Sequence, residues 1–82
     1  MSAFYRIEVK GYLDENMSHR LGGLRISTHQ REDLTAVATL SGRVRDQTEL
    51  TDILNNLYEM HLPILSVENL FDEQGNAHGE DP

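Results

Sequence analysis

Cysteine and tryptophan are both missing from this chain of 82 residues. Without cysteine there is no disulfide framework, no thiol nucleophile and no thiolate metal site. Long apolar runs are missing as well, since none approaches the roughly 18 to 20 residues that a membrane-spanning helix needs. The first residues, Met1 to Arg6, also lack the basic segment and apolar stretch of an export signal. We therefore expect a cytoplasmic protein with no membrane partner, held together by its core or by association.

Basic residues are few, because 7 Lys and Arg stand against 14 Asp and Glu and leave a net charge of −7. This acidity opposes binding to phosphates at long range, and the predicted strands carry no aromatic ladder for stacking bases. We therefore expect no nucleic-acid partner. The length leaves room for one core, and we expect a single α+β domain over residues 1–71 followed by a disordered acidic tail over residues 72–82.

Alternation of apolar and polar residues predicts four strands. They span residues 5–11, 24–29, 35–44 and 64–70. The second and third are separated by the polar stretch 30–33, which favours a hairpin between them.

Two helices are predicted between these strands. A short one lies within residues 12–23, where Asp14 is a candidate N-cap and the pair Gly22-Gly23 supplies a left-handed stop. A long one spans residues 47–60, with Asp46 as its N-cap. This helix must end before Pro63, and His61 takes the position where glycine or asparagine usually makes the left-handed exit.

The order strand, short helix, strand, strand, long helix, strand is that of ferredoxin-like domains. If the first crossover is too short to join parallel strands, the first two strands pair as neighbours in an antiparallel meander instead. Either arrangement gives a four-stranded antiparallel or mixed sheet with one main helix on one face. We expect its core to contain Ile7, Val9, Ile26, Leu40, Leu50, Ile53, Leu54, Leu57, Leu65 and Val67.

The sheet face away from the helix is expected to meet water and to carry four of the basic residues. The alternation places on it Arg6, Glu8, Lys10, Arg25, Ser27, His29, Thr35, Val37, Thr39, Ser41, Arg43, Ser66 and Glu68. The long helix has the opposite sign, because its charged residues are Asp46, Glu49, Asp52 and Glu59. Cross-strand ion pairs and a solvated helix explain this pattern. The alternative is that Arg6, Lys10, Arg25 and Arg43 receive an acidic partner, such as the helix face or tail of a second copy.

No constellation in the sequence predicts catalysis or a metal site. The four histidines, His19, His29, His61 and His78, fall on separate segments without ligand spacing. The loop after the first strand has one further reading, because small regulatory domains with this element order often bind metabolites there. Its candidate ligand-binding residues are Gly11, Asp14, Asn16, Gly22 and Gly23.

Four segments carry a resemblance to short bacterial proteins of unassigned function. They are Gly11-Tyr12-Leu13-Asp14, Gly23-Leu24-Arg25-Ile26, Leu40-Ser41-Gly42-Arg43-Val44-Arg45-Asp46-Gln47 and Leu62-Pro63-Ile64-Leu65-Ser66-Val67. The resemblance spans about residues 5–70 and implies bacterial origin and one small domain. It implies no activity.

These observations together predict a non-enzymatic interaction or assembly module without a cofactor. We expect it to associate with itself as a homodimer or to bind an acidic protein. The alternative hypothesis is a regulatory domain that senses a small molecule at the loop after the first strand.

Overall fold

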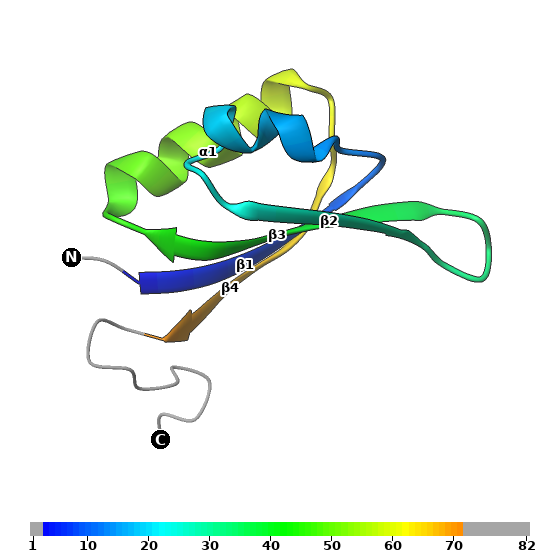
Figure 1. The fold of residues 1–82 in the computed structure, drawn as a ribbon, viewed down its shortest axis with the longest axis horizontal. Helices are drawn as coiled ribbons and strands as arrows, with labels where there is room; N and C mark the ends of the chain where they lie inside the picture. Colours follow the sequence, from blue (N-terminus) through cyan, green and yellow to red (C-terminus); the bar gives the residue numbers. More distant parts are fainter. Residues whose placement is uncertain (1–2, 72–82) are drawn as a thin grey trace.

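The computed structural model describes residues 3–71, which form a four-stranded sheet with both helices on one face (Figure 1). The elements along the chain are β1 (Ala3–Lys10), the 3-10 helix η1 (Glu15–Arg20), β2 (Arg25–Gln30), β3 (Ala36–Val44), the α-helix α1 (Gln47–Glu59) and β4 (Ile64–Phe71). This order is the one that the sequence predicts. The tail expected over residues 72–82 lies outside the described residues.

The strands lie in the order β2-β3-β1-β4, and each neighbouring pair is antiparallel. The prediction of an α+β fold with an antiparallel sheet and one main helix is confirmed. The alternative meander is wrong, because β3 lies between β1 and β2. Both of these strands run antiparallel to β3, so they are parallel to each other.

Local capping explains where the two helices begin and end. The Asp14 carboxylate accepts the Asn16 N–H at 2.8 Å at the start of η1, and Gly22 and Gly23 follow η1 with positive φ angles of 69° and 73°. The Asp46 carboxylate accepts the Glu49 N–H at 2.8 Å at the start of α1. His61 leaves this helix with a φ of 63°. All four predicted signals are confirmed.

The core lies between the sheet and the helices. Seven of its expected members are buried: Ile7, Val9, Ile26, Leu40, Leu50, Ile53 and Leu57. Leu54 is half-buried and packs against them. Leu21 and Leu24, which flank the glycine pair, are also buried, so the short crossover contributes to the core.

Three burial predictions are wrong. Leu65 and Val67 were expected in the core but are 45% and 42% exposed. The reason is that β4 is an edge strand, while α1 lies over the central part of the sheet. Val37 was expected to face water but is fully buried, flanked in register by Lys10 on β1 and His29 on β2.

Within residues 3–71, neither helix is long and apolar enough to cross a membrane.

The glycine pair after η1 provides a matched test of packing. Both residues have a positive φ, so Gly23→Ala should lower the free energy of unfolding by about 1 to 2 kcal/mol through backbone strain alone, because a Cβ at Gly23 meets open space. A Cβ at Gly22 would also lie 2.8 Å from the Cδ1 atom of the buried Ile53. Gly22→Ala should therefore cost about 1 kcal/mol or more beyond Gly23→Ala. Urea unfolding measures both, and equal losses would contradict the packing of Gly22 against α1.

Candidate functional site

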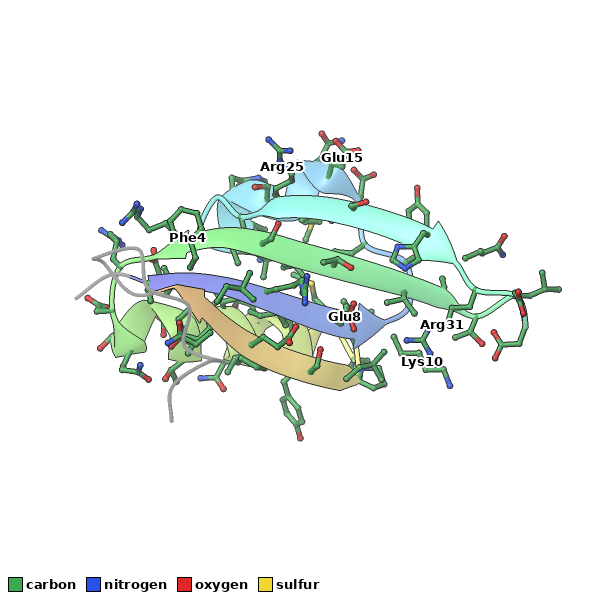
Figure 2. All side chains as sticks on the ribbon, turned by 90° about the horizontal axis from the view of Figure 1, so that it is seen from below. Phe4, Glu8, Lys10, Glu15, Arg25 and Arg31 are labelled. Atoms are coloured by element: carbon green, nitrogen blue, oxygen red, sulfur yellow. The ribbon has the colours of Figure 1, made fainter. Side chains whose placement is uncertain are left out.

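The four basic residues expected to meet a partner lie on the sheet face that no helix covers within the described chain, which we call the open face. Arg6 is opposite Ser41, which is in turn opposite Arg25, so these three form a row across β1, β3 and β2. Lys10 and Arg43 lie on the same face of β1 and β3. Figure 2 looks onto this face, with Lys10 and Arg25 labelled.

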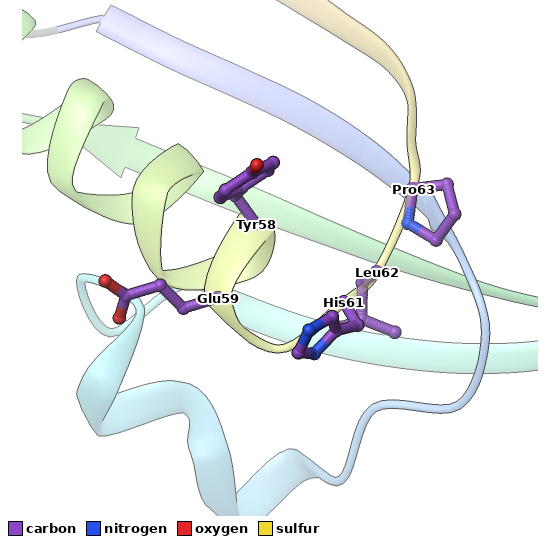
Figure 3. Close-up of a pocket in the computed structure, with 5 residues that line it drawn as sticks. All are labelled: Tyr58, Glu59, His61, Leu62 and Pro63. Atoms are coloured by element: carbon purple, nitrogen blue, oxygen red, sulfur yellow. The ribbon is translucent and has the colours of Figure 1, made fainter.

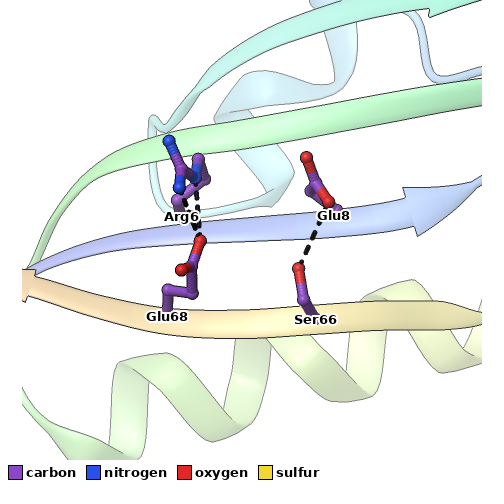
Figure 4. A network of polar contacts seen from close by, with 4 residues as sticks. All are labelled: Arg6, Glu8, Ser66 and Glu68. Atoms are coloured by element: carbon purple, nitrogen blue, oxygen red, sulfur yellow. Dashed lines mark hydrogen bonds and ion pairs between the residues drawn. The ribbon is translucent and has the colours of Figure 1, made fainter. Parts of the chain in front are cut away.

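Two of these cations already have partners in the chain. Arg6 Nε and Nη2 donate to Glu68 Oε1 on β4 at 3.0 and 2.7 Å, and this hydrogen bonding raises the pKa of Arg6 (Figure 4). The Arg43 guanidinium lies 4.8 Å from the centroid of the Phe4 ring. Lys10 and Arg25 are exposed and have no ion-pair partner among the described residues. The cross-strand pairing expected from the sequence is therefore present, and half of the proposed basic surface takes part in contacts within the chain.

The five residues of the alternative ligand site are spread along the crossover. Gly11 ends β1 beside Leu62, while Asp14 and Asn16 line a small cavity at the start of η1. Gly22 lies at the other end of η1, in contact with α1. The six residues of η1 separate these positions by about 12 Å. The crossover therefore brings together Asp14 and Asn16 but not the whole set.

Polar groups of this crossover are bonded to the chain itself. The Thr28 hydroxyl on β2 donates to the Leu13 carbonyl at 3.0 Å. The Ser18 hydroxyl donates to the Leu24 carbonyl at 2.6 Å, and the Asn56 amide on α1 donates to the Arg20 carbonyl at 2.8 Å. These bonds tie η1 to β2 and α1, which is a structural use of the loop.

The outer edge of β4 is a surface that the sequence analysis did not identify. Ile64, Leu65 and Val67 are 40%, 45% and 42% exposed. Val67 is opposite the fully buried Ile7, so it points to the helix side of the sheet and yet remains 42% exposed. The adjacent apolar residues Ile64 and Leu65 break the two-residue alternation, and the register of β4 shifts at this point. That break was the available signal in the sequence.

An open cavity of about 580 Å³ lies beside the start of β4. It is lined by Tyr58, Glu59, His61, Leu62 and Pro63, where α1 exits toward β4 (Figure 3). Tyr58 is 78% exposed. The cavity adjoins the start of β4 and is mainly apolar, with Glu59 and His61 as the polar part of its lining.

Metal-ligating side chains do not gather in the described part of the chain. Over residues 3–71, no group of three or more His, Asp and Glu side chains is placed to hold a metal ion.

Two carboxylates have displaced pKa values, and both accept backbone hydrogen bonds. The Arg45 N–H at 2.8 Å, and then the Arg45 guanidinium, lower the pKa of Glu49. The Thr35 N–H at 3.0 Å lowers the pKa of Asp33 in the β2–β3 turn. Both groups are held ionised as local caps, which is unlike the raised pKa of a proton donor.

The displaced pKa of Glu49 makes stability depend on pH. A carboxylate whose pKa is lower in the folded state stabilises that state above its unfolded pKa, near 4.5, and this contribution is lost as the pH falls through the folded value. Glu49→Gln should therefore be less stable than the parent chain at pH 7, and the two should converge in acid. Urea unfolding at pH 7 and at a pH below 4 measures this. A difference that is the same at both pH values would contradict the assignment.

Comparison with known proteins gives one match. No curated protein and no solved structure matches this chain. The model of one family, described as Domain of unknown function (DUF8691), matches residues 4–68, which include all but the ends of the sheet. The chain therefore belongs to the DUF8691 family of domains of unknown function.

Proposed function

We propose that this protein is a non-enzymatic interaction module that binds another protein along the outer edge of β4. The observation that carries the proposal is the row of half-exposed apolar side chains on this strand, Ile64, Leu65 and Val67. An edge strand offers unpaired backbone N–H and C=O groups, and a partner strand can add to it by main-chain hydrogen bonding. The exposed side chains would supply the apolar contact that such an addition needs.

The contrast between the two edges of the sheet supports this choice. On β2, the side chains of Arg25, Ser27 and His29 are exposed and polar, and η1 packs over the strand. Natural proteins protect edge strands with charge or with a covering element. On its helix side the β4 edge carries Ile64 and Val67 together with Asn69, and its one charged side chain among the described residues, Glu68, is paired with Arg6. This edge is therefore better suited to binding than to remaining in water.

A role in binding rather than catalysis is supported by how the polar groups are used. The crossover polar groups at Asp14, Ser18 and Thr28 satisfy backbone groups of the same chain. The displaced carboxylates, Asp33 and Glu49, are turn and helix caps.

We also infer that the fold is ferredoxin-like, with its first helix reduced to η1. The support is that β3 lies between the parallel strands β1 and β2, and β1 lies between the parallel strands β3 and β4. This is the interleaved pair of split β-α-β units. A cytoplasmic location and bacterial origin stay predictions from the sequence.

Photo-crosslinking in the cells that make the protein tests the proposed interaction. A benzophenone amino acid in place of Val67 should give covalent adducts with protein on irradiation, because position 67 lies in the contact. The same amino acid in place of Ser27, which is exposed on the opposite edge and on the open face, is the matched control. No adduct from position 67 would overturn the proposal. Adducts from position 27 alone would favour an acidic partner on the open face instead.

The metabolite-sensing alternative has its own measurement. A ligand that binds only the folded protein raises its melting temperature by mass action. A thermal-shift screen of amino acids, nucleotides and common metabolites should leave the melting temperature unchanged. A reproducible rise that is lost in Asn16→Ala would favour a site at the crossover over the β4 edge.

A further inference from the structure

The central part of β4 is a regular strand between two irregularities. Its register against β1 shifts on either side of the four residues Ser66, Val67, Glu68 and Asn69. In these four the alternation is clean: Val67 lies opposite the core residue Ile7, while Ser66 and Glu68 contact Glu8 and Arg6 on the open face (Figure 4). A strand added to this edge would therefore meet a defined pattern of side chains.

When two copies of one strand pair antiparallel about a two-fold axis, the axis passes either through a pair of equivalent residues or midway between two neighbouring positions. Residues directly opposite each other must also point to the same face of the sheet. We compare the registers centred on three of these positions, Ser66, Val67 and Glu68. A centre at Glu68 places two carboxylates opposite each other, which is destabilising. A centre at Ser66 places the Glu68 carboxylate opposite the apolar Ile64.

The register centred on Val67 joins complementary groups next to its centre and leaves one apolar–polar pair, Leu65 opposite Asn69. On the helix side it places Val67 against Val67, so two half-exposed apolar side chains cover each other. On the open face it places the Ser66 hydroxyl opposite the Glu68 carboxylate of the other copy. Within its own chain the Ser66 hydroxyl makes only a long bond of 3.4 Å to Glu8. Both Arg6 bonds go to Oε1 of Glu68, so the described chain leaves Oε2 able to accept this hydroxyl.

Charge is the main obstacle to joining two chains that each carry −7. Three of the four acids of α1 lie away from β4, because Asp46, Glu49 and Asp52 border the cavity between α1 and η1, while Glu59 lines the cavity at the start of β4. The flank of α1 on the other side of its buried stripe has no charge, since helical spacing places Gln47, Thr51, Leu54 and Tyr58 there. A second copy on the β4 edge would thus approach a strand whose one acid among the described residues, Glu68, is paired with Arg6.

From these observations we propose that a second copy of this chain is the partner, paired antiparallel through β4 about a two-fold axis at Val67. This inference rests on the proposed function and names its partner. The dimer has one continuous eight-stranded sheet with the helices of both copies on the same face. Ile64 then lies opposite Leu70 of the other copy. This Leu70 lies next to the cavity whose apolar lining is Tyr58, Leu62 and Pro63.

The absence of native cysteine allows a direct test of this register. In the Val67→Cys variant the two thiols lie across the axis with Cβ atoms about 4.5 to 5.5 Å apart, within reach of a disulfide after a small adjustment. Oxidised glutathione should convert this variant to a species of twice the chain mass. Leu65→Cys is the matched control, because Leu65 is equally exposed but lies opposite Asn69, which places the two Leu65 residues about 13 Å apart along the strand. Cross-linking that is equal in the two variants, or missing from both, overturns the register.

Association itself is measured by light scattering over a wide range of protein concentration. The parent chain should pass from monomer to dimer, and Val67→Lys should raise the dissociation constant about tenfold or more, because it buries two ammonium groups side by side. Ser27→Lys places the same charge on the other edge strand and should leave the constant unchanged. A parent chain that stays monomeric, or a dimer unaffected by Val67→Lys, overturns the inference. If position 67 nevertheless gives photo-adducts with a different protein, the interaction function stands and only the identity of the partner is wrong.

Discussion

The width of a helix limits how much of this sheet can be protected from water. An α-helix is about 10 Å wide and neighbouring strands are about 4.8 Å apart, so one helix shields about two strands. Here α1 packs on β3 and shares a core cluster with Ile7 and Val9 of β1, and the six-residue η1 packs on β2. The fourth strand, β4, lies at the edge of the sheet, and its Val67 is exposed although it points to the same side as the buried Ile7.

The charge distribution agrees with this incomplete coverage. The acids of α1 lie toward η1 and solvent, where Asp46 and Glu49 also cap the start of the helix. The single acid on the β4 edge, Glu68, is paired with Arg6 from the neighbouring strand. A strongly acidic chain therefore keeps one apolar and nearly uncharged strip, which joins the cavity next to Tyr58. The position of this strip on an edge strand is the reason that we propose protein binding there.

The sequence predicts features that depend on neighbours along the chain and does not predict features that depend on strand order. The cap at Asp46 and the left-handed exit at His61 follow from residue type and position, and both were predicted correctly. Alternation identified β4 as a strand, but it cannot tell an edge strand from a central one, so Val67 was wrongly placed in the core. The prediction that Val37 faces water was wrong for the converse reason, because β1 and β2 flank Val37 and bury it on the open face. The adjacent apolar pair Ile64-Leu65 was the available signal for the candidate site, but its exposure depends on β4 having a single neighbour in the sheet.

Amide hydrogen exchange along β4 tests the central claim most directly, because it reports on the backbone groups at the unshielded edge. If this edge is a binding surface for a second copy, the outward-facing amides between Ser66 and Asn69 should exchange rapidly in dilute protein and slow down as the concentration rises. Amides of β3, which is paired on both sides, should be protected from exchange at every concentration. Outward-facing β4 amides that exchange equally fast at every concentration would contradict the account.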